Sequence, residues 1–119
     1  MSAADPAAQT VRDIIEASRY LVLATADAAG RPWSSPVYFA HTDLTEFFWV
    51  SSPGVTHSRN IAVRPQVGIA IFDSQAAIGT GQGVFMSGAG LRLYRATVDS
   101  HWILAKDGQP DHRVPVVLT

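Results

Sequence analysis

The stretch YLVLATADAAGRPWSSPVYFAH, residues 20–41, decides the fold class. Its first part, YLVLATA (20–26), is rich in β-forming residues, and DAAGRP (27–32) has the Asp and Gly of a hairpin turn. WSSPVYFAH (33–41) then alternates between two faces, which is the period of a strand. Residues 20–41 therefore predict a β-hairpin. Pro36 inside its second strand indicates a sheet edge or a bulge, because proline has no N–H to donate to a ladder.

Six further strands are predicted after this hairpin, each short and bounded by Pro, Gly or polar turn residues. They are FFWVSS (47–52), QVGIAIFD (66–73), VFMSG (84–88), LRLYRATV (91–98), HWIL (101–104) and HRVPVVL (112–118). TDLTE (42–46) is predicted as a turn and SQAAIGTGQG (74–83) as a glycine-rich loop.

Two short helices are predicted to flank the strands. Asp5-Pro6 opens the first, because an acidic N-cap followed by proline is a typical helix start, and apolar residues at helical spacing extend it over residues 6–18. The second runs from about Thr56 to Val63 and stops at Arg64-Pro65, since proline disfavours helix at the preceding residue. Short strands in hairpins with two helices predict a mostly antiparallel barrel, of the all-β or α+β class.

Length and composition favour a single domain of 119 residues with a partner on part of its surface. Charged residues make up 16%, whereas about a quarter is typical, so a subunit interface or a bound cofactor is expected; a compact monomer is the alternative. A net charge of -1 argues against nucleic-acid binding, which needs a basic stripe. The absence of cysteine from the sequence excludes disulfides, thiolate metal sites and cysteine nucleophiles.

The sequence carries no targeting or membrane signal that we recognise. MSAADPAAQT (1–10) lacks both a basic start and an apolar run, so no signal peptide is expected. No apolar segment approaches the length needed to cross a bilayer. We therefore expect a cytoplasmic protein with no membrane partner.

The residues THSRN (56–60) are the strongest candidate for a binding site. A helix N-terminus presents unpaired N–H groups and about half a positive charge, which suits a phosphate. Ser58 adds a hydroxyl, and Arg59 adds a planar guanidinium that matches two phosphate oxygens. The alternative is an ordinary surface helix that Thr56 caps and on which Arg59 is solvated.

Two further features point to a bound ligand. GTGQG (79–83) lacks the Walker lysine and precedes a strand, so it is neither a P-loop nor a dinucleotide fingerprint, although Gln82 can give a ligand one hydrogen bond. Trp102 and Arg113 are predicted to cover a flat ligand or to fill an interface.

The histidines show no sign of a metal site or a catalytic triad. His41, His57, His101 and His112 lack metal-ligand spacing, and no serine–histidine–acid arrangement is evident. Asp99 and Asp111, the acids near histidines, are assigned to turns. We therefore expect no metal, and an enzyme of this sequence would take its reactivity from a cofactor.

The chain resembles the pyridoxamine 5′-phosphate oxidase-like flavin-binding split barrels in four blocks that keep the family's order. These blocks are LVLATADAAGRPWSSPVYFAH, FFWVSS, THSRNIAVRPQVGIAIFDS and GQGVFMSG. The resemblance covers about residues 12–88, and HWIL…HRVPV is similar to the family's closing tryptophan-plus-arginine segment. It implies a homodimer of six-stranded antiparallel split β-barrels with flanking short helices, and an FMN or deazaflavin in each of two grooves between the subunits.

The resemblance also assigns the phosphate contacts of the cofactor. Ser58 and Arg59, with His57 beside them, match the family's phosphate-binding turn. Asn60 stands where the pyridoxamine 5′-phosphate oxidases have lysine, which removes one positive charge from this turn. No residues match those that hold pyridoxal phosphate in these oxidases, so the resemblance does not extend to that substrate.

The resemblance assigns three further groups of residues. Gln82 matches the family's glutamine at a strand entrance, and Trp102 and Arg113 would come from the other subunit. Related chains carry a longer segment after Gly88, where only Ala89-Gly90 intervene before the next predicted strand. The strands along the isoalloxazine ring correspond to Ser35, Pro36, Val37, Tyr38, Val50, Ser51 and Ser52.

These features together predict an FMN-dependent oxidoreductase that transfers hydride to a small-molecule substrate. One alternative is a deazaflavin-dependent reductase. Another is a non-catalytic protein that stores or senses a flavin or a haem. The last is a dimeric barrel that binds no ligand.

Overall fold

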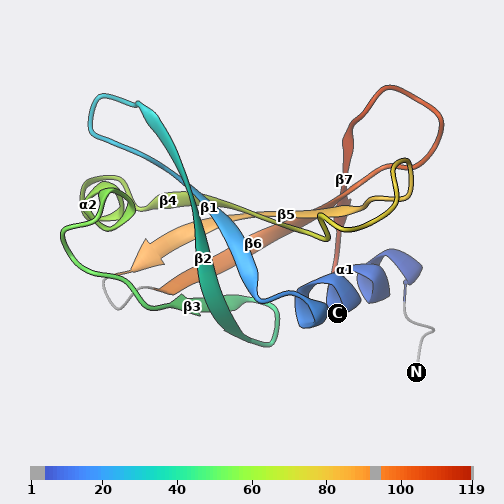
Figure 1. The fold of residues 1–119 in the computed structure, drawn as a ribbon, viewed down its shortest axis with the longest axis horizontal. Coiled ribbons are helices and arrows are strands. Elements are labelled where there is room, and N and C mark those ends of the chain that lie inside the picture. Colours follow the sequence, from blue (N-terminus) through green and yellow to red (C-terminus); the bar gives the residue numbers. More distant parts are fainter. Residues whose placement is uncertain (1–4, 92–94, 119) are drawn as a thin grey trace.

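The computed structural model of the chain describes residues 5–91 and 95–118 (Figure 1). Within these ranges the chain forms two helices and seven strands. The helices are α1 (Pro6–Ala17) and α2 (Thr56–Val63). The strands are β1 (Tyr20–Ala26), β2 (Pro32–Thr42), β3 (Glu46–Trp49), β4 (Gln66–Phe72), β5 (Gly83–Leu91), β6 (Arg95–Leu104) and β7 (Arg113–Val116).

The strands form one antiparallel sheet in the order β3-β2-β1-β4-β5-β6-β7. An additional pairing of β3 with β6 closes the first six strands into a barrel, and β7 is added outside on β6. The expected fold, a mostly β six-stranded antiparallel barrel with short helices, is therefore confirmed. Residues 32–38 of β2 pair only with β1, while β3 pairs with residues 39–42. Pro36 thus lies on an open strand edge, as its missing N–H predicts.

The C-terminal strands differ from the prediction at Asp99. LRLYRATV and HWIL were expected as two strands separated by a turn, but β6 runs unbroken through Asp99. The ladder with β5 pairs Ser87 with Ser100 and Gly88 with Val98, so Asp99 is the extra residue of a β-bulge. Val98 and His101 both point inward although they are three residues apart, because the bulge changes the alternation of inward and outward side chains along β6. In the sequence this change looks like a break between two strands.

The predicted Ala89-Gly90 link is also wrong, because both residues belong to β5 and pair with Thr97 and Ala96. The connection to β6 falls on 92–94, outside the described residues. Gly90 is required where it stands: its N–H donates to the Pro65 carbonyl at 2.7 Å, and a Cβ there would lie 2.8 Å from Ile61 Cγ2. Gly90 thus lets α2 approach β5.

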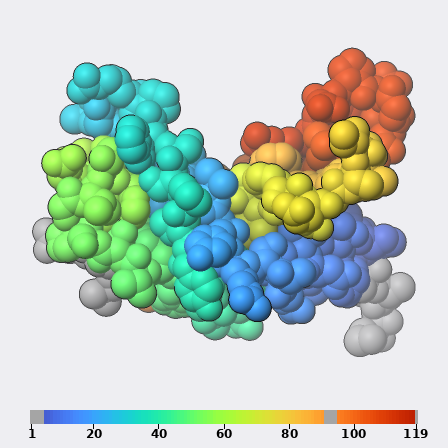
Figure 2. All heavy atoms as spheres, in the orientation of Figure 1, coloured from blue at the N-terminus to red at the C-terminus, as the bar shows by residue number. Residues whose placement is uncertain are grey.

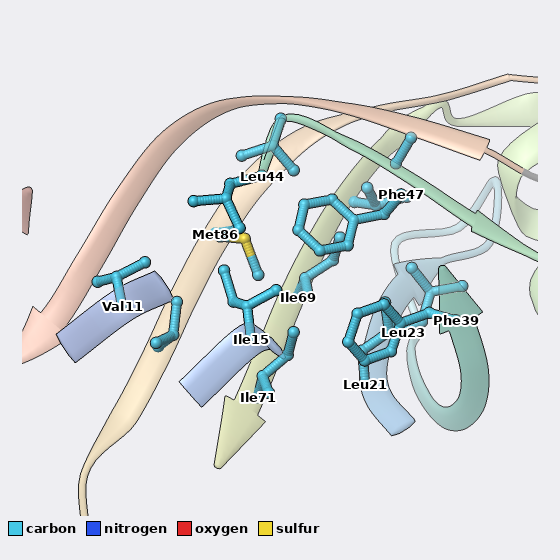
Figure 3. Close-up of a cluster of buried hydrophobic side chains, with 14 of the residues drawn as sticks. Val11, Ile15, Leu21, Leu23, Phe39, Leu44, Phe47, Ile69, Ile71 and Met86 are labelled. Atoms are coloured by element: carbon cyan, nitrogen blue, oxygen red, sulfur yellow. The ribbon is translucent and has the colours of Figure 1, made fainter. Parts of the chain in front are cut away.

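The core fills the barrel and extends beneath α1 (Figure 3). Phe47 is fully buried near its centre, and Val11 and Ile15 of α1 point into the same cluster. In Figure 1 the two helices lie at opposite ends of the barrel: α1 contacts β4 and β5, whereas α2 contacts chiefly β1 and β2. The end next to α2 contains the predicted phosphate-binding turn.

Two histidines are buried, and both make the stability of the fold depend on pH. Burial lowers the pKa of His57 and of His101, and His101 Nε2 donates a hydrogen bond to the Leu44 carbonyl at 2.8 Å. Since the unfolded chain binds protons at the ordinary pKa of 6.5, the unfolded state takes up more protons below that value. We expect the free energy of unfolding, measured by urea titration, to be lower at about pH 5 than at about pH 7.5. Equal or greater stability at the acidic pH would contradict this assignment.

Candidate functional site

The N-terminus of α2 has no side-chain cap. Its N-cap residue is Val55, whose side chain cannot accept a hydrogen bond, and Thr56 is the first helical residue. The alternative in which Thr56 caps the helix is therefore wrong. Without a cap, the first N–H groups of α2 keep their donors and their partial positive charge for another acceptor.

Ser58 and Arg59 lie in this first turn in contrasting environments. Ser58 is only 8% exposed, and its Oγ is buried without a hydrogen-bond partner in the described part of the chain. A buried hydroxyl without a partner costs about 1–3 kcal/mol, so an acceptor from a ligand would relieve it. Arg59 is exposed and makes no ion pair among residues 5–91 and 95–118. A phosphate supplies the acceptor oxygens that both groups lack.

Two polar side chains fix α2 against the β1–β2 hairpin. Asn60 is buried, and its Nδ2 donates to Thr25 Oγ1 at 3.1 Å. Beyond the other end of the helix, Arg64 donates from Nε to the Asp27 carbonyl at 3.1 Å and from Nη2 to the Ala28 carbonyl at 3.2 Å. The amide nitrogen of Asn60 is thus engaged within the protein, and a direct role for Asn60 in cofactor binding stays a prediction. Sequence reasoning missed Arg64, which supports the site from outside.

The structure brings Ser51 and His57 together, a pair that the sequence did not reveal. Ser51 Oγ lies 2.5 Å from His57 Nε2, across the loop that joins β3 to α2. Burial lowers the pKa of His57, so its imidazole is neutral at pH 7. The signal in the sequence was their closeness, six residues apart, on either side of a strand-to-helix loop.

The residues predicted to lie along a flavin ring come from the open edge of β2 and from this loop. Ser35 and Val37 face the barrel interior opposite Leu23 and Leu21, whereas Pro36 and Tyr38 face outward. The backbone N–H and C=O groups of residues 35–38 that point away from β1 have no partner on another described strand. Such an edge can donate and accept hydrogen bonds with a flat ligand.

Val50, Ser51 and Ser52 were predicted as the end of a strand, but β3 stops at Trp49. The ladder between β2 and β3 ends where Trp49 pairs with Phe39, and the chain beyond Trp49 leaves the edge of β2 over residues 32–38 unpaired. Val50 is consequently 95% exposed, and the loop leads directly into α2. The predicted ring and phosphate residues therefore converge at one end of the barrel.

Gln82, Trp102 and Arg113 form a second group: Gln82 lies directly before β5, Trp102 on β6 and Arg113 at the start of β7. Gln82 uses its amide within the protein: Oε1 accepts from the N–H groups of Gly83 and Leu104 at 2.9 and 3.1 Å, and Nε2 donates to Leu104 O at 3.1 Å. The Arg113 guanidinium lies 3.9 Å above the Phe85 ring, and Phe85 pairs with Trp102. Figure 1 places β7 on the other side of the molecule from α2. Within one chain, this group and the α2 group do not meet.

The outer surface of the sheet carries an apolar row that crosses six strands at paired positions. Its members are Pro36, Val22, Ala70, Phe85, Trp102 and Pro115. We call these six residues the outer row. Their neighbours along each strand point into the core, so the row faces away from it. Figure 2 shows the molecule hollowed between the β1–β2 hairpin and the β6–β7 hairpin.

The family model for pyridoxamine 5′-phosphate oxidase matches residues 7–117. The chain belongs to this family. No curated protein sequence matches the chain significantly.

Solved structures of similar fold include haem-associated proteins. The heme-binding protein of Mycobacterium smegmatis has a TM-score of 0.73 at 19% identity, with 96% of this chain and 60% of that chain covered. HutZ, the heme storage protein of Vibrio cholerae, has a TM-score of 0.59 at 20% identity, with 85% and 64% covered. HupZ of Group A Streptococcus has a TM-score of 0.66 at 18% identity, with 82% and 94% covered. The chain thus spans less than two thirds of the length of the first two proteins, and the likeness shows a shared fold.

The residues present at α2 fit the phosphate of a cofactor from the pyridoxamine 5′-phosphate oxidase family. An uncapped helix N-terminus, a buried Ser58 hydroxyl without a partner and an exposed Arg59 are complementary to a phosphate group. Residues 5–91 and 95–118 contain no cluster of three or more His, Asp or Glu side chains that could hold a metal ion. In the same ranges no helix is long and apolar enough to cross a membrane.

Proposed function

We propose that the chain is an FMN-binding oxidoreductase that works as a homodimer, with the FMN phosphate held at the N-terminus of α2. The observation that carries this proposal is the Ser58 hydroxyl, buried without a partner in the first turn of a helix that lacks a cap. A deazaflavin with a phosphate at the same turn is the closest variant of this proposal.

The protein's own residues would bind and orient the cofactor. Ser58, Arg59 and the first N–H groups of α2 would hold the phosphate, and the open edge of β2 from Ser35 to Tyr38 would lie along the rings. Bound flavin supplies hydride transfer to a small substrate. Backbone N–H groups at this edge would stabilise negative charge on the reduced ring without reorganising, because the strand holds them in place.

A homodimer accounts for two observations that a single chain leaves unexplained. The outer row is a partly exposed apolar surface across six strands, with Pro36 and Pro115 exposed and the other four half-buried, and apolar surfaces of this kind are typical of protein interfaces. Arg113 begins β7 and Trp102 pairs with Pro115 of β7, which lies on the other side of the molecule from α2 (Figure 1), so these residues would complete the cofactor site only from a second copy. The homodimer and the cytoplasmic location expected from the sequence both stay predictions.

Haem binding is the second candidate function. Two structurally similar proteins are named for binding or storing heme, and the broad apolar outer row would suit a large flat ring. Haem carries carboxylates where FMN carries a phosphate, so its contacts with the N-terminus of α2 would be weaker. A protein that only stores or senses its ligand belongs to this candidate.

Absorbance titrations with FMN, a deazaflavin and haem distinguish these functions. We expect saturable FMN binding with a two-band flavin spectrum, whereas haem binding would give a Soret band. Arg59→Ala removes a charge-assisted contact of about 1.5–3 kcal/mol, so FMN affinity should fall by about ten- to a hundred-fold. Arg19→Ala, at an exposed position between α1 and β1, is the matched control and should bind normally. Unchanged affinity in Arg59→Ala would refute the phosphate role, and absence of turnover with NAD(P)H would favour storage over catalysis.

A further inference from the structure

The Ser51–His57 pair lies directly beside the proposed phosphate site. His57 is the second residue of α2 and is 8% exposed, and its Nε2 is 2.5 Å from Ser51 Oγ. Ser51 is half-buried, so as a residue it is more exposed than His57. The pair couples a titratable group to a hydroxyl at the end of the helix.

The positive charge at this turn reaches only the lower limit of the negative charge on a phosphate monoester. Such a group carries about -1.5 to -2 at pH 7. The helix N-terminus contributes about half a positive charge, and Arg59 contributes one. Asn60 adds none, and its Nδ2 donates to Thr25. A further positive charge is therefore needed to balance the full dianion, and His57 is the one residue of the turn that can supply it.

We propose that His57 is a proton-dependent second cation of the α2 anion site, so that an anion binds there together with one proton. This inference rests on the proposed function. The imidazolium form has hydrogen on both ring nitrogens, so Nε2 can only donate and Ser51 Oγ must accept. The hydroxyl hydrogen of Ser51 is then free to donate to the ligand. Where the neutral ring accepts from Ser51, proton uptake by this buried ring thus frees the hydroxyl hydrogen of the serine.

No charged neighbour stabilises protonated His57 in the described residues, so a bound anion would have to do so. Burial is the one cause that lowers its pKa, and no charged neighbour offsets it in the described residues. The elements packed against α2 are β1, β2 and β5, and β5 has no titratable side chain. The other titratable or charged groups lie on β1, on β2, on the hairpin between them, and on α2 with its C-cap. They are Tyr20 on β1, Tyr38 and His41 on β2, Asp27 and Arg31 on the hairpin, Arg59 on α2 and Arg64 at its C-cap. An incoming anion would therefore be the main partner of the imidazolium.

The sign of the resulting pH dependence follows from the proton taken up on binding. Because the free site holds neutral imidazole and the occupied site holds imidazolium, anion affinity must rise as pH falls. The rise is up to about tenfold per pH unit while the pH lies above the pKa of His57 in the free protein, and it levels off below that pKa. A permanent cation such as Arg59 gives no such slope.

Sulfate is the probe for this test, because it stays a dianion and any pH dependence then belongs to the protein. Sulfate affinity of the wild-type protein would be measured by calorimetry between about pH 5.5 and 8.5, a range that brackets the ordinary histidine pKa. We expect affinity to rise towards acidic pH, and heats in two buffers of different ionisation enthalpy to show uptake of close to one proton near neutral pH.

Three variants separate His57 from the rest of the site. His57→Gln should bind sulfate with no pH slope, while Arg59→Ala should bind it more weakly at every pH and keep the slope. His112→Gln, at an exposed position in the segment before β7, should keep both affinity and slope. A thermal melt of each variant confirms that it is folded.

The outcomes distinguish the inference from the function on which it rests. Sulfate binding with no slope in the wild-type protein, or a slope that survives in His57→Gln, would overturn the role of His57 and leave the anion site standing. Failure of sulfate to bind at any pH would overturn both the anion site and the inference.

Discussion

Ala70→Glu is expected to convert the protein into a folded monomer that binds FMN weakly. Ala70 lies in the middle of the outer row, between Val22 and Phe85, with its side chain directed away from the core. In a homodimer built on this row, the new carboxylate would be buried without a partner, which costs about 3 kcal/mol or more. The dimer dissociation constant should therefore rise by about a hundred-fold or more. FMN affinity should fall with it, because the partner's Trp102 and Arg113 would be lost from the site.

Sedimentation velocity over a range of concentrations tests this expectation. The wild-type protein should sediment at twice the chain mass of 12.8 kDa, and Ala70→Glu at the chain mass. Ala62→Glu, at an exposed position on α2, adds the same charge elsewhere and should remain dimeric. A wild-type monomer, or an Ala70→Glu dimer, would show that the outer row is not the interface.

Gly88→Ala is expected to lower the free energy of unfolding by about 3 kcal/mol, because the added methyl group has no space. A Cβ at this position would overlap the Thr97 carbonyl oxygen and lie within 3.0 Å of Thr97 C and Val98 Cα. These are backbone atoms of β6 at the bulge, and they cannot move aside without breaking the ladder that pairs Gly88 with Val98. The loss should therefore exceed what an ordinary glycine substitution causes.

Gly81→Ala is the control for this variant, since a Cβ there meets nothing within 4 Å. Urea unfolding at neutral pH measures both proteins against wild type, and Gly81→Ala should change stability by less than about 1 kcal/mol. If Gly88→Ala were as stable as Gly81→Ala, the close approach of β5 and β6 would be wrong.

Local signals in the sequence predicted the first hairpin and α2 almost to the residue. Strand 20–26 and helix 56–63 have the predicted bounds, because turn residues and the Arg64-Pro65 stop act over a few neighbours. The open edge at Pro36 followed from the missing N–H of one residue. These features depend on short-range chemistry, which a sequence displays directly.

Features set by contacts between distant segments were not predictable in the same way. Alternation across β6 shifts at Asp99 because a bulge lies there, opposite Ser87 and Gly88 of β5, so one strand looked like two. The engagement of Asn60 with Thr25 joins positions 35 residues apart, and no local pattern announces it. The pairing of Ser51 with His57 depends on the path of the loop between β3 and α2, which the residue types alone do not fix.

The affinity of the wild-type protein for FMN relative to riboflavin tests the central claim most directly. The two molecules share their rings and differ in the phosphate, so the ratio isolates the contribution of the α2 turn. Fluorescence titrations in one buffer should show FMN binding at least about tenfold more tightly, since each charge-assisted contact to the phosphate contributes about 1.5–3 kcal/mol. Equal affinity for the two molecules would contradict the claim that Ser58, Arg59 and the uncapped end of α2 hold a phosphate.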